Sequence, residues 1–311
     1  MTDIVISEFM DEAAVEELRR DFSVTYDKGL VDRPEELAGL VAGARALIVR
    51  NRTQVRGTLL AAGDRLEAIG RLGVGLDNID VAAAKARGIA VLPATGANDV
   101  SVAEWAVTTI MVLLRGAYYA TDAVAAGTWP RERLMGREIS GKVLGLVGFG
   151  SIARETAVRA KALGMTIIAA DPFVAADDPA WARIGARPVS LDALVAEADA
   201  ISLHVPLTAE TRNLIDAKCL AAMKPGAVLV NAARGGVVDE AALAAALRAG
   251  TLAGAALDVF DMEPLKAGSP LTGCPNLILT PHIAGVTVES NVRVSSVTAA
   301  NVRRVLQERR R

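Results

Sequence analysis

The sequence predicts an α/β fold made of two doubly wound parallel sheets, one in each of two domains. Short apolar runs alternate with Ala-, Leu- and Glu-rich stretches along most of the chain, a pattern typical of βα units. One of these runs, Val143–Val147, leads directly through a glycine-rich turn into a helical stretch. A chain of 311 residues also exceeds the size at which a single hydrophobic core stops growing, which favours two domains.

The N-terminal part of the chain supplies the elements of the first sheet. Its expected strands are Ile4–Ile6, Ala46–Val49, Leu66–Ile69 and Ile89–Leu92. The expected helices between them are Asp11–Arg20, Thr58–Ala62 and Val81–Arg87, the last of which ends at Gly88.

The pattern changes around Asn98, where we place a domain boundary. Ser101 is expected to cap a long apolar helix, Val102–Arg115, with Glu104 in the capping-box position. The charged stretch from residue 127 to 141, which contains Trp129, is expected to form a surface arm.

The alternation of strands and helices resumes after Lys142. The expected strands are Val143–Val147, Thr166–Ala170, Ala200–Leu203, Ala227–Asn231, Gly254–Asp258 and Leu277–Thr280, and the expected helices are Ile152–Leu163, Leu191–Glu197 and Glu240–Ala249. Valines then recur at an approximate helical spacing from residue 287 to 307, and this tail is expected to pack back on the first domain. We therefore expect residues 100–282 to form one domain, and residues 1–99 with 283–311 to form the other.

The composition limits the partners and the compartment. The 34 Lys and Arg residues are balanced by 36 Asp and Glu residues, so no cationic face for nucleic acid is expected. Cys219 and Cys274 lie far apart without metal-ligand spacing, which favours the reducing cytoplasm and argues against a bound metal. We see no signal peptide and no unbroken apolar segment of about 18 residues, so a membrane is not an expected partner.

A dinucleotide site is predicted at the turn after Val143–Val147. The run Gly148-Phe149-Gly150-Ser151-Ile152-Ala153 matches G-x-G-x-x-G/A, in which the glycines let a pyrophosphate approach the start of a helix. The next strand ends at Asp171, 171 − 153 = 18 positions further on, where a carboxylate binds ribose hydroxyls and repels a 2′-phosphate. NAD is therefore the expected cofactor. The alternative is a purely structural glycine turn with Asp171 as a helix cap.

Three residues that follow strands of the second domain form a predicted catalytic set. Arg234, Glu263 and His282 each follow one of the last three expected strands, whose carboxyl ends face the ligand crevice of an open α/β sheet. Imidazole suits the proton exchange of a secondary alcohol, and a carboxylate beside it stabilises its charged form. A guanidinium clamps a substrate carboxylate. Alone, each residue has an ordinary reading as a cap, a loop charge or a turn anchor; together they favour an oxidoreductase.

These motifs resemble the D-isomer-specific 2-hydroxyacid dehydrogenase family over nearly the whole chain. Besides the glycine turn, the resemblance is carried by His204-Val205-Pro206-Leu207-Thr208, Asn231-Ala232-Ala233-Arg234-Gly235 and Pro281-His282-Ile283-Ala284-Gly285. It implies a Rossmann NAD domain, a flavodoxin-like substrate domain, and hydride transfer between nicotinamide and C2 of a small 2-hydroxy or 2-oxo acid.

The resemblance also implies roles for single residues. His282 would be the acid/base, Glu263 would pair with it, and Arg234 would bind the substrate carboxylate and carbonyl. The loop Leu72-Gly73-Val74-Gly75 would hold the carboxylate through the N–H groups of Val74 and Gly75, as an anion nest. Asp258 would lie at the carboxamide and Pro206 beside the adenine pocket. The expected NAD contacts are Gly148, Phe149, Gly150, Ser151, Ile152, Asp171, His204, Val205, Pro206, Ala232, Ala233, Arg234, Asp258 and His282.

Within the family, the chain is similar to two groups of enzymes whose substrates carry a second anion. The run from Arg71 to Asp80 resembles phosphoglycerate dehydrogenases, and the runs 94–98 and 101–104 resemble (S)-sulfolactate dehydrogenases. Arg50 and Arg52, just after the expected strand Ala46–Val49, are candidates to bind that second anion. An ordinary surface arginine is the alternative for either of them.

Two other functions stay open at this point. The chain also resembles NAD-sensing transcriptional corepressors, which are binding proteins of the same fold, and phosphite or formate dehydrogenases share the fold too. The helix after Ser101 and the Trp129 arm resemble the family's dimer contact, so we expect a homodimer.

Overall fold

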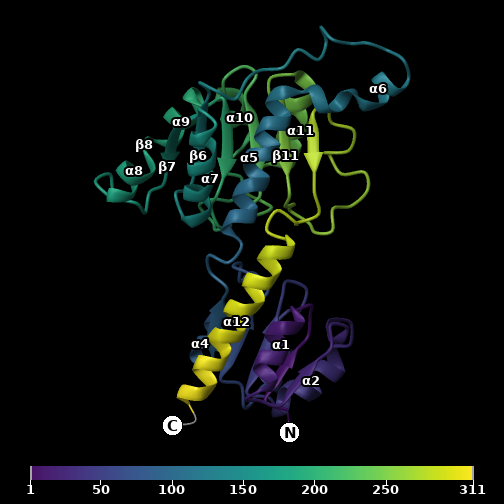
Figure 1. The fold of residues 1–311 in the computed structure, drawn as a ribbon, viewed down its shortest axis with the longest axis vertical. Coiled ribbons are helices and arrows are strands. Elements are labelled where there is room, and N and C mark those ends of the chain that lie inside the picture. The colour runs from purple at the N-terminus through teal and green to yellow at the C-terminus, as the bar shows by residue number, and fades with distance from the viewer. Residues whose placement is uncertain (1, 310–311) are drawn as a thin grey trace. The chain divides into compact units, whose positions relative to one another are not determined.

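The computed structural model describes residues 2–309, which fold into two compact units (Figure 1). One unit runs to Asn98 and resumes at Val286, and the other spans Asp99–Gly285. The predicted fold class is confirmed, because each unit is a parallel sheet flanked by helices.

The first unit contains a five-stranded parallel sheet. Its strands are β1 (Ile4–Ile6), β2 (Val24–Tyr26), β3 (Ala46–Val49), β4 (Ala68–Arg71) and β5 (Ala90–Pro93), in the order β2-β1-β3-β4-β5. β1 and β3 are buried at every position, as expected for parallel strands covered on both faces. The strand order reverses between β1 and β3, so the ligand crevice of this unit is expected outside their carboxyl ends.

Helices cover both faces of this sheet. They are α1 (Glu12–Arg19), α2 (Pro34–Gly43), α3 (Gly57–Ala62), α4 (Val81–Ala86) and α12 (Val288–Glu308), with a 3₁₀ turn at Leu30–Asp32. α12 begins with a capping box formed by Thr287 and Ser290. Its buried face, which includes Val302 and Leu306, packs into the same core as β1 and β3. The yellow C-terminal helix therefore completes the unit that the purple N-terminal elements begin (Figure 1).

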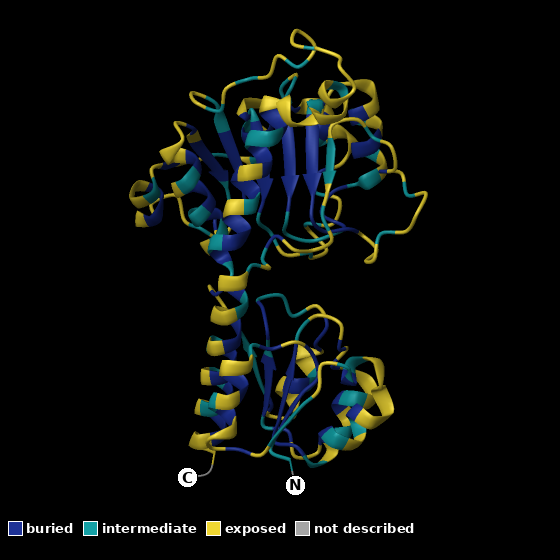
Figure 2. Cartoon of the chain, turned by 45° about the vertical axis from the view of Figure 1, so that its right-hand side comes forward, coloured by how far each residue is buried: buried dark blue, intermediate teal, exposed yellow. Residues whose placement is uncertain are grey.

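The second unit contains a seven-stranded parallel sheet. Its strands are β6 (Val143–Val147), β7 (Thr166–Ala170), β8 (Ala186–Pro188), β9 (Ala200–Leu203), β10 (Val228–Asn231), β11 (Gly254–Leu257) and β12 (Leu277–Leu279), in the order β12-β11-β10-β9-β6-β7-β8. The central strands are dark blue in Figure 2, whereas the helices outside them present exposed faces. The order reverses between β6 and β9, which places the crevice of this unit at their carboxyl ends.

Two apolar layers sandwich this sheet. The helices are α5 (Asp99–Arg115), α6 (Thr121–Ala125), α7 (Ser151–Ala162), α8 (Pro179–Ile184), α9 (Leu191–Glu197), α10 (Ala217–Ala222) and α11 (Glu240–Ala249), with a 3₁₀ turn at Ala117–Ala120. One layer contains α9, α10 and α11, and the other contains α5, α7 and α8. In residues 2–309 no single helix is both long and apolar enough to span a membrane; only the bent pair Asp99–Arg115 and Ala117–Ala125, taken together, passes by length and composition.

Some local expectations were wrong. α5 begins at Asp99, so Ser101 is not its cap but lies inside the helix, where it is buried. The capping-box pattern placed the start too late because the two residues before Ser101 already have helical backbone. β2 and β8 were not predicted, since they are three-residue edge strands and β8 contains a proline, which only an edge tolerates.

Candidate active site

The glycine turn of the second unit has the shape that a dinucleotide requires. Gly148 follows β6 with φ +91°, and a Cβ there would lie 2.5 Å from the carbonyl oxygen of His204, so only glycine fits. A Cβ on Gly150 would meet no protein atom within 4 Å, which shows open space at the start of α7. The first N–H groups of α7 have no partners within the helix, and they are suited to bind a pyrophosphate. Ser151 and Ile152 form the first turn of α7.

Asp171 is tied directly to this turn. One carboxylate oxygen accepts a hydrogen bond of 2.7 Å from the backbone N–H of Phe149, and the other accepts one of 2.9 Å from Phe173. The Phe149 ring is buried and stacks on Trp181 with a centroid separation of 4.1 Å. The acidic residue at the end of β7 is therefore held at the glycine turn, where the sequence predicted a ribose-binding carboxylate.

His204 lies on the other side of the turn, after β9. Its Nε2 is 3.0 Å from the Ser202 hydroxyl, and burial lowers the pKa of His204 to about 4. The ring is therefore neutral at neutral pH. Val205 also approaches Gly148, whereas Pro206 is exposed and its carbonyl accepts a hydrogen bond of 2.6 Å from Thr211.

The structure joins His282 to Glu263. The Nδ1 atom of His282 lies 2.7 Å from Oε2 of Glu263, and Oε1 of Glu263 accepts a hydrogen bond of 3.1 Å from the N–H of Phe260. The two side chains are 43% and 35% exposed, so both still reach solvent. Because Glu263 takes Nδ1, the Nε2 atom of His282 is the one available to a substrate.

Asp258 anchors the loop that carries His282. The residue is only 1% exposed, and its carboxylate oxygens accept hydrogen bonds from the Thr280 hydroxyl at 2.6 Å and from the N–H groups of Ile283 and Ala284 at 2.8 Å each. The backbone N–H of His282 donates to the Asp258 carbonyl at 2.8 Å. These contacts give Asp258 a structural role, while its contact with the carboxamide stays a prediction.

The loop that carries Arg234 packs against the loop that carries Glu263. Asn231, at the end of β10, holds the turn that leads to Arg234. Its side-chain amide N–H donates to the Arg234 carbonyl at 2.9 Å, and its amide oxygen accepts from the N–H of Ala233 at 3.0 Å. Gly235 packs against Phe260, since a Cβ there would lie 1.8 Å from the Phe260 carbonyl oxygen. The Arg234 loop and the Glu263 loop therefore touch, and Ala232 and Ala233 lie half-buried between β10 and Arg234.

In the first unit, Arg50 and Arg52 have different surroundings. Arg50 is half-buried; its guanidinium donates to the Asn291 amide oxygen at 2.7 Å and lies 5.9 Å from the centre of the Phe9 ring. Burial lowers the pKa of Arg50, which still stays charged. Arg52 is exposed and forms an ion pair with Asp32. The carboxylate of Glu8, 4% exposed, accepts hydrogen bonds from the N–H groups of Arg50, Arg52 and Thr53 and fixes this loop at the crevice of the sheet.

Three residues of these sites were missed in the sequence. Glu8, Asn291 and Asn231 hold functional loops in place. Asn231 belongs to the motif Asn231–Gly235, but no role was assigned to it, and Glu8 and Asn291 belong to no motif. Glu8 follows β1 and Asn231 is the last residue of β10, so both lie at the carboxyl end of a strand, and that position is a signal that could have found them. Asn291 lies far from Arg50 in the chain and becomes its neighbour only through the packing of α12.

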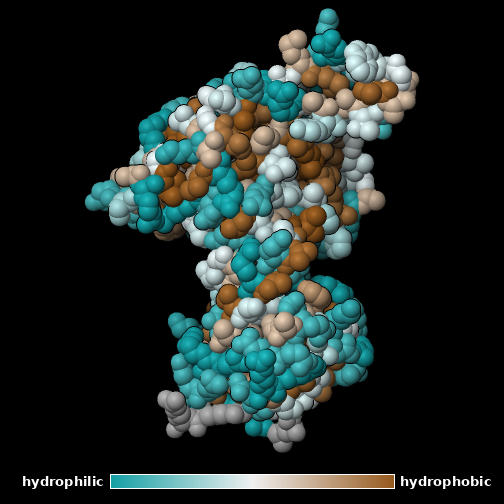
Figure 3. Space-filling view, in the orientation of Figure 1, coloured by the Kyte–Doolittle hydropathy of each residue, from teal (hydrophilic) through white to brown (hydrophobic). Residues whose placement is uncertain are grey.

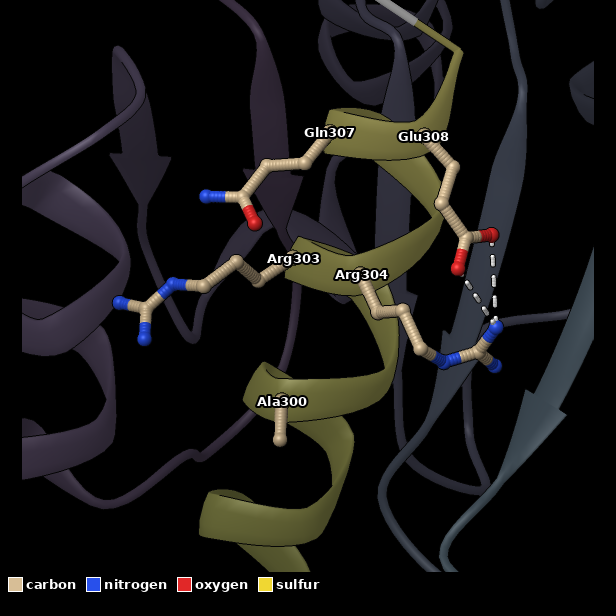
Figure 4. A pocket seen from close by; sticks show the side chains of 5 residues that line it. All are labelled: Ala300, Arg303, Arg304, Gln307 and Glu308. Atoms are coloured by element: carbon tan, nitrogen blue, oxygen red, sulfur yellow. Dashed lines mark hydrogen bonds and ion pairs between the residues drawn. The ribbon is translucent and has the colours of Figure 1, made fainter.

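A surface hollow of about 390 Å³ lies elsewhere, on the C-terminal part of α12 (Figure 4). It is lined by Ala300, Arg303, Arg304, Gln307 and Glu308. Its charges are already paired, Arg303 with Glu17 and Arg304 with Glu308, and it contains none of the predicted site residues. It therefore has no part in the chemistry.

Comparison with known proteins agrees with this geometry. The model of the NAD-binding domain of D-isomer-specific 2-hydroxyacid dehydrogenases matches residues 107–284. The chain belongs to this family. This dehydrogenase is 60% identical to the (S)-sulfolactate dehydrogenase of Chromohalobacter salexigens over 306 residues, which covers 98% of this chain and 99% of that one.

Two further proteins that are similar to this dehydrogenase are named for other 2-hydroxy acids. It is 40% identical over 299 residues to the D-3-phosphoglycerate dehydrogenase of Archaeoglobus fulgidus, covering 96% of this chain but only 56% of that longer one. Its structure superposes with a TM-score of 0.85 on D-lactate dehydrogenase from Aquifex aeolicus, solved with NAD and lactic acid, at 28% identity over 98% of this chain and 96% of that one. The predictions of an NAD-dependent enzyme acting on 2-hydroxy acids are thus confirmed.

Proposed function

We propose that this dehydrogenase interconverts (S)-sulfolactate and its 2-oxo acid, sulfopyruvate, with D-3-phosphoglycerate as the second candidate substrate. The observation that carries the proposal is the setting of Arg50 at the crevice of the first unit. Within residues 2–309 this half-buried guanidinium forms no ion pair, and its side-chain partner is the neutral amide of Asn291. Such a cation is suited to a second anionic group on the substrate. The 60% identity to an (S)-sulfolactate dehydrogenase supports the choice.

The chain's own residues account for the movement of the proton. In the oxidation of the alcohol, Nε2 of His282 takes the hydroxyl proton, and the 2.7 Å contact with Glu263 stabilises the imidazolium that forms. In the reduction of the ketone, the same atom returns the proton to the carbonyl oxygen. Arg234 is assigned to the substrate carboxylate and to the oxygen on which negative charge develops.

The part of the reaction assigned to NAD is the transfer of the hydride. When bound at the turn formed by Gly148 and Gly150, NAD would supply the acceptor for the hydride from C2 of the hydroxy acid, and NADH would supply the hydride for C2 of the oxo acid. Asp171 and the first turn of α7 would hold its ribose and its pyrophosphate.

The test is a comparison of substrates followed by NADH absorbance. We expect kcat/KM for sulfopyruvate, or for phosphohydroxypyruvate, to exceed that for pyruvate and glyoxylate by about 10–100-fold, the value of one charge-assisted hydrogen bond. Arg50→Met should remove most of this advantage. Arg52→Met is the matched control and should remove less, because Arg52 is already paired with Asp32. A preference for pyruvate over both larger acids would contradict the substrate assignment, and no turnover of any acid would favour a binding protein.

We further propose that the protein is a homodimer, with the arm after α5 in the contact. Large apolar side chains are exposed there: Tyr118 67%, Trp129 74% and Met135 82%. Figure 3 shows apolar surface gathered around α6, and exposed apolar patches of this kind commonly mark protein interfaces. Sedimentation should give twice the monomer mass for the wild type, and Trp129→Ser with Met135→Ser should weaken the dimer. A monomeric wild type at micromolar concentration would contradict the proposal.

A further inference from the structure

The side chain of Arg71 turns into the loop that follows its own strand. Its Nε donates to the carbonyl of Gly75 at 2.8 Å, and its Nη1 donates to the carbonyl of Leu72 at 2.6 Å. Gly73 lies between these two residues with φ +143°, and a Cβ on Gly73 would come within 2.1 Å of Nη1 of Arg71. The guanidinium therefore fills the space that a larger residue at position 73 would need, and it braces both ends of the loop.

In this loop most backbone carbonyls accept hydrogen bonds, whereas two backbone N–H groups donate to none of the described residues. Besides the two carbonyls bound by Arg71, the Gly73 carbonyl accepts from Ala94 at 2.9 Å and the Leu76 carbonyl accepts from Ile79 at 2.9 Å. By contrast, no group in residues 2–309 accepts a hydrogen bond from the N–H of Val74 or of Gly75, and both residues are half-buried. A loop in which the carbonyls of Leu72, Gly73 and Gly75 are occupied and two neighbouring N–H groups are open is suited to an anion.

The position of the loop agrees with this reading. It follows β4, and the N–H of Leu72 donates to the carbonyl of Val49 at 2.8 Å, so the loop starts beside the end of β3. β3 is also the strand that leads to Arg50. The loop thus belongs to the crevice side of the sheet in the first unit, and the charge of Arg71 adds to its positive potential.

We propose that Arg71 is a positioning residue that shapes the Leu72–Gly75 loop into an anion nest and strengthens it with its charge. The inference rests on the proposed function, in which the N–H groups of Val74 and Gly75 hold the substrate carboxylate. Arg71 acts through the loop and does not touch the substrate itself. Its loss therefore weakens the binding of a carboxylate and leaves the binding of NADH unchanged.

The test compares Arg71→Met with a matched control in the same unit. Arg87 also donates from its guanidinium to two backbone carbonyls, those of Leu60 and Gly63, but at the C-terminal end of α3, which leads to the amino end of β4, away from the crevice. Both substitutions remove one such brace. We would measure the KM of the preferred oxo acid, the binding of oxalate to the NADH-loaded enzyme, the Kd of NADH, and the Tm.

Arg71→Met should raise the KM and the Kd of oxalate by about tenfold or more, because the loop loses both the brace that shapes its N–H groups and the nearby positive charge, and the Kd of NADH should stay unchanged. Arg87→Met should lower the Tm about as much as Arg71→Met does, but it should keep the wild-type KM and the wild-type Kd of oxalate. Arg71→Lys should recover part of the loss, since one ammonium keeps the charge but lacks the fork that reaches both carbonyls.

Equal KM and equal oxalate binding in Arg71→Met and Arg87→Met would overturn the role of Arg71. If Arg71→Met does not fold, Arg71→Lys decides, because wild-type oxalate binding combined with a lowered Tm would show a purely structural residue. The proposed function is tested separately, by the rates at which the wild-type enzyme reduces oxo acids. An enzyme that reduces no oxo acid disproves that function, whereas oxalate binding still tests the nest.

Discussion

Nδ1 of His282 lies 2.7 Å from Oε2 of Glu263, and this contact links the loops that follow two neighbouring strands, β11 and β12. His282 adopts φ +57°, a left-handed conformation that non-glycine residues seldom adopt. The cost of that conformation is offset by the buried carboxylate of Asp258, which binds the backbone on the C-terminal side of His282. The contacts of Asp258 therefore help to hold the imidazole against the carboxylate of Glu263.

Glu263→Gln should lower kcat by about 10–100-fold, because the amide keeps the shape of the side chain but no longer stabilises a charged imidazole. His282→Ala should lower kcat further, by about 10²–10⁴-fold, with the Kd of NADH unchanged in both variants. Asp261→Asn is the control, since this exposed carboxylate lies in the same loop and pairs with Arg212 rather than His282. Steady-state rates with the preferred oxo acid would settle the point, and a Glu263→Gln enzyme as fast as Asp261→Asn would refute the role of the pair.

Asp171→Asn should shift the cofactor preference towards NADP. The carboxylate bound to the N–H of Phe149 brings a negative charge to the end of β7, where it would repel a 2′-phosphate. We expect the ratio of kcat/KM for NAD to kcat/KM for NADP to fall by about tenfold or more. Asp177→Asn, on the exposed stretch before α8, should leave the ratio unchanged. An unchanged ratio in Asp171→Asn would mean that another residue selects the cofactor.

Much of this site could be predicted because its residues lie at strand ends. Continuous apolar runs such as Ala200–Leu203 mark buried parallel strands, and the residues that follow them must lie at the crevice. For this reason His282 and Glu263, distant in sequence, could be expected to meet. The same logic failed for β2, whose Val24–Tyr26 segment is half-buried at every position and so lacks a strong apolar signal.

Contacts made by tertiary packing could not be predicted. Asn291 binds Arg50 because α12 packs on the sheet of the first unit, and no local pattern reports that register. The bond between Arg71 and its own loop depends on a side-chain direction that the sequence does not encode locally. Arg52 was grouped with Arg50 because both are cations just after the strand Ala46–Val49, yet Arg52 pairs with Asp32, which gives the two residues different surroundings.

Gly235→Ala should lower both stability and kcat. The added methyl group would lie 1.8 Å from the Phe260 carbonyl oxygen, so the loops that carry Arg234 and Glu263 must move apart. Overpacking of this kind costs about 1–3 kcal/mol of unfolding free energy. Gly39→Ala is the matched control, because this exposed glycine in α2 has no atom within 4 Å of the new methyl, and it should stabilise the protein by about 0.5–1 kcal/mol. Denaturant unfolding and steady-state rates would be compared; a Gly235→Ala enzyme with wild-type kcat would show that the two loops act independently.

The burial of His204 should make stability fall at acid pH. Its pKa is lowered from the ordinary 6.5 to about 4, so between these values the unfolded chain binds a proton that the folded chain does not. The contribution of this group to stability is therefore complete above the unfolded pKa and is lost as the pH falls towards 4. His204→Gln cannot titrate and keeps a polar group within reach of Ser202. The Tm of the wild type should fall more between about pH 7 and pH 5 than that of His204→Gln, whatever their difference at neutral pH. Parallel declines would show that His204 is protonated as readily in the folded protein as in the unfolded chain.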